Sequence, residues 1–240
     1  MPVDTALILA GGLGTRLRSA VPDLPKVLAP VGGRPFLEYL FLQLLKYEFR
    51  EAVVSVGYRA EQIKRTFGSS YQSLKIEYVT ETTPLGTGGG LKLAASVVRN
   101  YPVLVMNGDS FCDLDLQDFV KYHAAKSAQL TMALTSVADS NRFGKVLIDD
   151  AGKVLAFEEK QAVGGPGLIN AGLYLCSEDV PDLITAGTVC SLERDLFPRL
   201  LNGSFYGYAA TATFIDIGIP ESLAAAQDII PAIFGIGPQL

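Results

Sequence analysis

The chain of 240 residues contains no tryptophan, one histidine and three cysteines. The number of cysteines is odd, and Cys112, Cys176 and Cys190 lack the paired spacing of a zinc site. A single histidine cannot complete such a site. We therefore expect reduced thiols, with Cys112 as a small buried apolar residue rather than a catalyst. His123 stands among lysines of a predicted helix, and we expect it on the surface.

Basic residues are scarce as well, because 20 lysines and arginines stand against 25 acidic residues, for a formal net charge of −5. This balance disfavours a nucleic-acid-binding or anionic-membrane surface. No run of 18 apolar residues occurs, since Glu38, Gln43 and Lys46 interrupt the most apolar segment, and the N-terminal residues lack the pattern of a signal segment. We expect a cytoplasmic protein that binds neither nucleic acid nor membranes.

The chain does have an alternation of strand-like and helix-like segments in its first half. The expected strands cover residues 5–9, 52–56, 75–79 and 103–106, and the expected helices cover 35–47, 60–67, 87–98 and 116–125. A βαβ series of this kind predicts a Rossmann-like α/β fold, in which helices cover both faces of a mostly parallel sheet.

The second half differs in pattern. Its strand-like segments are separated by turns, which suggests mixed strand pairing; they cover residues 130–137, 145–148, 154–157 and 168–175. Helices are expected near 191–200 and 221–229, and the apolar residues 229–240 are expected to pack on the body or on a second subunit. The length fits a single domain over residues 1–240.

The stretch after the first predicted strand is the most informative one: Leu9-Ala10-Gly11-Gly12-Leu13-Gly14-Thr15-Arg16-Leu17, followed by Pro25-Lys26. Three glycines in four residues remove the side chains that would keep backbone N–H groups from a ligand. Arg16 and Lys26 add positive charge beside those amides, and the combination suits a polyphosphate. The stretch is neither a Walker A loop nor a dinucleotide-binding fingerprint, because it lacks the Gly-Lys-Ser/Thr end of the former and has Leu17 at the last glycine of the latter.

Acidic residues also occupy strand ends. Gly11, Glu81 and Asp109 each follow a predicted strand, so we expect them at one edge of a parallel sheet. The Asp109 carboxylate has the hard oxygens that Mg²⁺ prefers, although an aspartate here can also cap a helix or turn. Asp216 stands alone in an apolar stretch, where a carboxylate is costly unless it is paired or metal-bound, and it is a candidate second ligand.

Together these motifs resemble those of the sugar-1-phosphate nucleotidyltransferases, over nearly the whole chain. They follow in family order: residues 11–17 with Pro25-Lys26, Glu81 with residues 84–88, Asn107-Gly108-Asp109, residues 157–160, Asn170-Ala171-Gly172 and Asp216-Ile217-Gly218. Within the family, residues 26–36, 84–89, 157–160 and 214–218 are most similar to the bacterial D-glycero-D-manno-heptose 1-phosphate guanylyltransferases. The resemblance implies a nucleotidyltransferase (GT-A-like) fold. Its nucleotide-binding half would cover about 1–128 and its sugar-binding half about 129–240, and family members often form homodimers.

The resemblance implies an enzyme that transfers GMP from GTP to a heptose 1-phosphate, either D-glycero-D-manno-heptose 1-phosphate or a 6-deoxy relative, for surface polysaccharide biosynthesis. A sugar-phosphate oxygen would attack the α-phosphorus, and pyrophosphate would leave. Three catalytic residues are implied: Arg16 would hold the pyrophosphate, Lys26 would contact the α-phosphoryl and sugar-phosphate oxygens, and Asp109 would act with Asp216 to hold Mg²⁺.

Glu81 favours guanine, because an ionised carboxylate accepts hydrogen bonds from both N1–H and the N2 amino group, whereas uracil and thymine offer only N3–H. The nucleotide-binding residues that the resemblance implies are Leu9, Ala10, Gly11, Gly12, Gly14, Thr15, Glu81, Gly86 and Thr87. Those for the sugar phosphate are Gly144, Glu159, Lys160, Asn170 and Gly172.

Other interpretations stay open at this point. Within the same class, the sugar could be mannose 1-phosphate, or the enzyme could be a uridylyl- or thymidylyltransferase acting on another sugar 1-phosphate. A Rossmann oxidoreductase is disfavoured by the incomplete fingerprint and by the pairing of Arg16 with Lys26. A non-catalytic nucleotide-sugar sensor is disfavoured because such a protein would be expected to lose Lys26 or one of the two aspartates.

Overall fold

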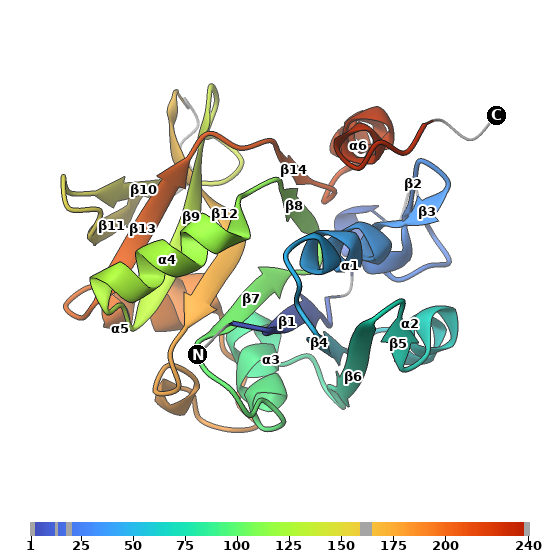
Figure 1. The fold of residues 1–240 in the computed structure, drawn as a ribbon, viewed down its shortest axis with the longest axis horizontal. Helices are drawn as coiled ribbons and strands as arrows, with labels where there is room; N and C mark the ends of the chain where they lie inside the picture. The colour runs from blue at the N-terminus through green and yellow to red at the C-terminus, as the bar shows by residue number, and fades with distance from the viewer. Residues whose placement is uncertain (1–2, 13, 18–20, 159–164, 238–240) are drawn as a thin grey trace.

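One mixed sheet organises the molecule (Figure 1). The computed structural model describes residues 3–12, 14–17, 21–158 and 165–237. Eight strands pair in the order β13-β9-β12-β7-β1-β4-β6-β5. In that order they cover Phe205–Ala210, Leu130–Val137, Gly167–Cys176, Val103–Asn107, Thr5–Ala10, Glu51–Val56, Leu74–Thr80 and Ser70–Tyr71.

The centre of this sheet is parallel. Strands β7, β1, β4 and β6 run in one direction. Strand β12 is antiparallel to both of its neighbours, β7 and β9, and the edge strand β13 is parallel to β9. The predicted α/β fold with a mostly parallel, mixed sheet is therefore confirmed, and β1, β6 and β7 all end at the same edge.

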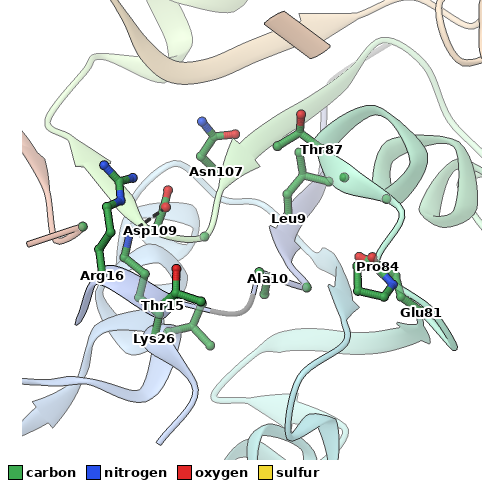
Figure 2. Close-up of a pocket in the computed structure, with 18 of the residues that line it drawn as sticks. Leu9, Ala10, Thr15, Arg16, Lys26, Glu81, Pro84, Thr87, Asn107 and Asp109 are labelled. Atoms are coloured by element: carbon green, nitrogen blue, oxygen red, sulfur yellow. Dashed lines mark hydrogen bonds and ion pairs between the residues drawn. The ribbon is translucent and has the colours of Figure 1, made fainter. Parts of the chain in front are cut away.

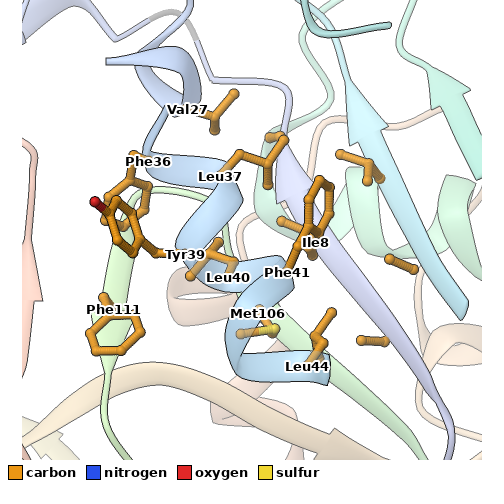
Figure 3. Packing of buried hydrophobic residues seen from close by; sticks show 14 of the residues in the cluster. Ile8, Val27, Phe36, Leu37, Tyr39, Leu40, Phe41, Leu44, Met106 and Phe111 are labelled. Atoms are coloured by element: carbon orange, nitrogen blue, oxygen red, sulfur yellow. The ribbon is translucent and has the colours of Figure 1, made fainter. Parts of the chain in front are cut away.

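Helices cover both faces of the sheet because β1 is apolar on both sides. Ile8 belongs to a core cluster with Leu37 and Phe41 of α1, as Figure 3 shows, whereas Leu7 belongs to the opposite cluster with Leu91 of α3. Alternating apolar side chains on both faces are typical of a buried parallel strand. The α-helices in the described part of the chain are α1 (Phe36–Lys46), α2 (Ala60–Phe67), α3 (Gly86–Ala95), α4 (Leu116–Lys126), α5 (Phe197–Leu200) and α6 (Pro220–Ile233).

Short helical turns and three small sheets complete the fold. The 3₁₀ turns are Thr15–Leu17, Lys26–Leu28 and Pro181–Leu183, and Leu192–Leu196 is a π-helix. The two-stranded sheets pair β2 (Pro30–Val31) with β3 (Arg34–Pro35), β8 (Ser110–Cys112) with β14 (Phe214–Asp216), and β10 (Lys145–Ile148) with β11 (Val154–Glu158).

The β8–β14 pair matters most for the site. Asp216 pairs with Ser110, and the N–H of Ile217 donates to the carbonyl oxygen of Asp109 at 3.0 Å. A residue close to the C-terminal helix is thereby fixed beside the turn that follows β7.

Most of the expected elements lie within three residues of their predicted bounds, but α6 ends at Ile233 rather than at 229, and residues 191–200 differ in type. The strands β2, β3, β5, β8, β13 and β14 were not expected. Residues 191–200 form a π-helix followed by the short α5 rather than one α-helix. The sequence did not indicate β13, which is an edge strand with a glycine, Gly207, in its interior.

The prediction that His123 lies on the surface is wrong. The residue is 5% exposed, on the face of α4 that packs against β9, and its Nδ1 lies 2.7 Å from Thr131 Oγ1. The exposed Lys121 indicated the wrong face, because residues two apart on a helix point in different directions. Burial lowers the pKa of His123 to about 4.

The three cysteines are unpaired and buried. Burial raises the pKa of the Cys112 thiol to about 12, which keeps it protonated and unreactive, as its apolar role requires. Helix α6 continues to Ile233, and the ring of Phe234 packs against Tyr39 and Phe111, so this part of the C-terminal segment packs on the body. None of the helices in the described ranges has the length and apolarity needed to span a membrane.

Candidate active site

Two adjoining cavities open at the carboxyl ends of the parallel strands. The first, of about 420 Å³, contains the glycine loop, Glu81 and the turn after β7. Figure 2 shows Arg16, Lys26 and Asp109 on one side of this cavity and Glu81 on the other. The second, of about 460 Å³, extends towards β10, β12 and Asp216. Residues 11, 81 and 109 therefore meet at one edge, as their strand-end positions predicted.

All the residues predicted to bind the nucleotide line the first cavity: Leu9, Ala10, Gly11, Gly12, Gly14, Thr15, Glu81, Gly86 and Thr87. Two of the glycines have a further structural reason. A Cβ on Gly11 would lie 2.1 Å from Glu81 Oε1, and Gly14 has a φ of +58°, which favours glycine. Gly11 thus makes room for the acidic side chain across the loop, in addition to exposing backbone.

Glu81 is held in place by the protein at both oxygens. Ser55 Oγ donates to its Oε1 at 3.1 Å, and the N–H of Leu85 donates to its Oε2 at 3.0 Å. An ionised carboxylate has about four acceptor positions, so each oxygen can still accept a hydrogen bond from a ligand. The carboxylate therefore presents two adjacent acceptors to the cavity, beside Pro84 in Figure 2.

Lys26 lies between the two predicted aspartates. Its Nζ is 2.7 Å from Asp109 Oδ2 and 3.6 Å from Asp216 Oδ1, and its side chain is only 10% exposed. The second oxygen of Asp216 is 3.4 Å from the guanidinium of Arg142, and its Oδ1 accepts from the N–H of Gly218 at 2.6 Å. One ammonium group within reach of both carboxylates shows that Asp109 and Asp216 converge on a shared position.

This donor set fits a divalent cation. Mg²⁺ is commonly held by one or two carboxylates, with water and substrate phosphates completing its coordination. Asp109 and Asp216 supply two such carboxylates from the turn after β7 and from the end of β14. Among the described residues no group of three or more metal-ligating side chains occurs, so further ligands would have to come from substrate and water.

The second cavity contains three of the five residues predicted to bind a sugar phosphate. Gly144, Asn170 and Gly172 line it, whereas Glu159 and Lys160 lie outside the described residues. Gly172 has a φ of +75° where the β12–β9 register is irregular, and a Cβ there would lie 2.4 Å from Ser110 Oγ. Asn170 donates to the Tyr174 hydroxyl at 2.8 Å and accepts from the N–H of Gly172 at 2.9 Å, so internal contacts fix its orientation.

Several polar residues that line the cavities received no role from the sequence: Asn107, Ser110, Arg142, Lys145, Ser191, Glu193 and Arg194. Asn107 belongs to the Asn107-Gly108-Asp109 motif, in which Asp109 received the role, and Arg142 lies two residues before Gly144. Glu193 and Arg194 lie in a charged segment that indicated only a helix. No local signal distinguished them, because the π-helix brings them to the cavity through contacts with α3.

Thr87 connects the start of α3 to the π-helix. Its hydroxyl accepts from the N–H of Leu192 at 2.9 Å and lies 3.2 Å from Glu193 Oε2, to which it donates. Two glycines of α3 also pack closely against Cys190, since a Cβ on Gly86 or Gly88 would lie 2.6 Å from an atom of that residue. The glycine-rich start of α3 therefore packs against the segment that leads into the π-helix.

The fold and the cavities define a nucleotide-binding α/β protein whose site suits two phosphorylated ligands side by side. The chain belongs to the nucleotidyl transferase family, whose model matches residues 5–232. The resemblance of the sequence motifs to this family is thus confirmed.

Individual relatives are similar over most of the chain. The D-glycero-alpha-D-manno-heptose 1-phosphate guanylyltransferase of Aneurinibacillus thermoaerophilus is 39% identical over 92% of this chain and 96% of its own length. The mannose-1-phosphate guanylyltransferase of Mycobacterium tuberculosis is 36% identical over 95% of this chain and 65% of its own length. The crystal structure of HddC from Yersinia pseudotuberculosis complexed with GMP-PN has a TM-score of 0.84 at 33% identity, covering 94% of this chain and 99% of the other.

Proposed function

We propose that this protein is a sugar-1-phosphate guanylyltransferase that transfers GMP from GTP to D-glycero-α-D-manno-heptose 1-phosphate, giving GDP-heptose and pyrophosphate. The single observation that carries the proposal is the convergence of Arg16, Lys26, Asp109 and Asp216 at the border of two cavities. Such a border suits a reaction between two phosphorylated substrates, which must be brought together against their mutual repulsion. The named function of the Aneurinibacillus relative supports the choice of sugar.

In this reaction a phosphate oxygen of the sugar 1-phosphate attacks the α-phosphorus of GTP. The bond from that phosphorus to the bridging oxygen breaks, and pyrophosphate leaves with the electron pair. Arg16 neutralises the leaving pyrophosphate, and Lys26 moves from the aspartates onto the phosphoryl oxygens that gain charge in the transition state. No side chain acts as nucleophile, so correct positioning of the two substrates provides much of the rate.

A divalent cation belongs to the same proposal. Asp109 and Asp216 would hold Mg²⁺, which would supply positive charge to the reacting phosphates. Release of Lys26 from the aspartate pair would then free its ammonium group for substrate. The convergence of the Asp109 and Asp216 carboxylates on one position supports this proposed metal site.

The base is proposed to be guanine. Glu81 offers two adjacent acceptors at the far end of the first cavity, which match the N1–H and N2 amino donors of guanine. The complex of the Yersinia HddC with GMP-PN supports the same choice. A cytoplasmic location and a homodimer stay predictions.

A pyrophosphate-release screen tests the proposal directly. The protein is assayed with GTP, ATP, UTP and dTTP against the 1-phosphates of D-glycero-α-D-manno-heptose, its 6-deoxy relative, mannose and glucose. We expect the highest kcat/KM with GTP and the heptose. The named activity of the Mycobacterium relative makes mannose 1-phosphate the second candidate. A preference for UTP or dTTP would contradict the assignment of the base.

A further inference from the structure

Glu193 occupies an unusual position between the two cavities. Among the described residues, the four that line both are Arg16, Asn107, Asp109 and Glu193. Arg16 and Asp109 belong to the phosphate side. Glu193 is bonded instead to Thr87, which Figure 2 places across the first cavity from Arg16. A carboxylate therefore faces the junction of the two substrate sites from the side away from the phosphate-binding cations.

The carboxylate is fixed by neutral hydroxyl groups. Its Oε2 accepts from Ser191 Oγ at 2.9 Å and from Thr87 Oγ1 at 3.2 Å. Thr87 in turn accepts from the N–H of Leu192 at 2.9 Å, which ties the π-helix to α3. Within the described part of the chain, both hydrogen bonds to this carboxylate reach Oε2, so Oε1 can accept from a ligand. A π-helical turn at this point agrees with the frequent occurrence of this geometry at functional sites.

The charge of Glu193 restricts what it can recognise. A carboxylate repels the phosphate groups of both substrates, so it gains only from neutral hydrogen-bond donors, and a sugar hydroxyl is such a donor. Its neighbours Ser191 and Arg194 line the second cavity, and neither lines the first. Glu193 therefore borders the second cavity, where the sugar 1-phosphate would lie, together with both of these neighbours.

We propose that Glu193 is a sugar-recognition residue, whose carboxylate accepts a hydrogen bond from a hydroxyl of the sugar 1-phosphate. This inference rests on the proposed function and adds a specificity-determining residue to it. The ribose of the nucleotide is the other source of hydroxyl groups near the junction, and the experiment separates the two sources.

Glu193→Gln and Glu193→Ala are compared with the unmodified protein in the pyrophosphate-release assay. The substrates are the preferred sugar 1-phosphate and its analogues that lack one ring hydroxyl at a time. A hydrogen bond to a charged group implies that kcat/KM for the sugar falls about 10- to 100-fold in Glu193→Ala, with KM for GTP unchanged. One deoxy analogue should lose the same factor in the unmodified protein, and Glu193→Ala should no longer distinguish that analogue from the parent sugar.

The control is Glu178→Gln, an exposed glutamate that follows β12 and lines neither cavity; it should leave every ratio unchanged. The inference is overturned if Glu193→Ala raises KM for GTP and stops distinguishing GTP from its 2′- or 3′-deoxy forms, which assigns the ribose. It is also overturned if the unmodified protein and Glu193→Ala treat all the deoxy sugars alike.

Calorimetry with the same sugar 1-phosphates measures binding without turnover. If the unmodified protein binds them but releases no pyrophosphate, the proposed reaction fails while the role of Glu193 in binding is still measured. If no sugar 1-phosphate binds, this inference fails as well. Thermal unfolding of both variants reports any loss of the tie between the π-helix and α3.

Discussion

The two halves of this molecule supply site residues in different ways. In the parallel half, Gly11 and Glu81 come directly after β1 and β6, and Asp109 lies two residues after β7, so each site residue stands at the end of its strand. In the other half, Asn170 and Gly172 lie inside β12 at an irregular register, and Glu193 lies in a π-helix. The parallel half follows the general rule for ligand sites in α/β sheets, and the other half depends on a bulge and on docking between helices.

The two halves therefore differ in whether the position of a site residue depends on nearby or on distant parts of the sequence. A strand and the loop after it are contiguous in sequence, so the glycine loop is visible as a motif. The position of Glu193 depends on Thr87, which is more than a hundred residues away in the chain. Asp216 joins the two halves, since the β8–β14 pair carries it into the phosphate site of the first half. Substitutions on the two sides should therefore affect different kinetic parameters.

The largest effect is expected for Asp216→Asn, which tests whether a residue of the second half is essential in the first. Loss of a carboxylate from the proposed metal pair should lower kcat on the order of 10³-fold, because the reacting phosphates lose the charge that the cation supplies. Mn²⁺ binding, followed by electron paramagnetic resonance, should weaken in parallel. The control is Asp113→Asn, whose side chain forms a 3.7 Å ion pair with Lys46 and lines neither cavity. Activity within a few-fold of the unmodified protein would remove Asp216 from the site.

Lys26→Ala should have the next largest effect, with opposite results for catalysis and metal binding. Loss of a charged donor to the phosphoryl oxygens should lower kcat about 10²- to 10³-fold. Without nucleotide, Mn²⁺ should bind more tightly than to the unmodified protein, because Lys26 no longer competes for Asp109 and Asp216. Lys46→Ala, at an exposed position, is the control. Weaker Mn²⁺ binding in Lys26→Ala would contradict the idea that Lys26 and the cation share one position.

The fold and the phosphate side could be predicted from the sequence because their signals are local. Strand bounds were correct to within one residue for β1, β4, β6 and β7. The apolar runs of β1, β4 and β7 are buried on both faces, whereas β6 alternates between buried and more exposed residues. The glycine loop, Arg16 and Lys26 are close in sequence, so their shared role was visible. The sequence did not show, however, that Gly11 also makes room for the Glu81 side chain, because the two residues follow different strands.

The other half could not be predicted to the same depth. β13 is stabilised by its parallel pairing with β9, and its own sequence has a glycine and a weak alternation. The π-helix follows from the hydrogen bonds of Thr87 and from close packing at Gly88, neither of which leaves a periodic pattern. For Glu159 and Lys160 the roles stay predictions, because both lie outside the described residues.

Glu81→Gln should have a smaller effect, confined to the nucleotide. Glutamine replaces one acceptor with an N–H donor, which opposes a donor of guanine and should lower kcat/KM for GTP about 10- to 100-fold. ITP lacks the 2-amino group, so the preference for GTP over ITP should shrink, while KM for the sugar stays unchanged. Glu77→Gln, on the same strand, is the control. A change in KM for the sugar would show that the two halves do not select their substrates separately.

The smallest effect concerns stability alone and tests how His123 supports β9. The folded protein keeps His123 neutral down to a pH of about 4, whereas the unfolded chain binds a proton below its ordinary pKa near 6.5. Protons therefore favour the unfolded chain, and stability that is fully present above pH 6.5 is lost as the pH falls towards 4. At pH 5 the loss should be about 2 kcal/mol relative to pH 8. His123→Gln should remove this part of the pH dependence in urea unfolding. Equal pH dependence in both proteins would mean that His123 has the same pKa in the folded and the unfolded chain, which its burial against Thr131 opposes.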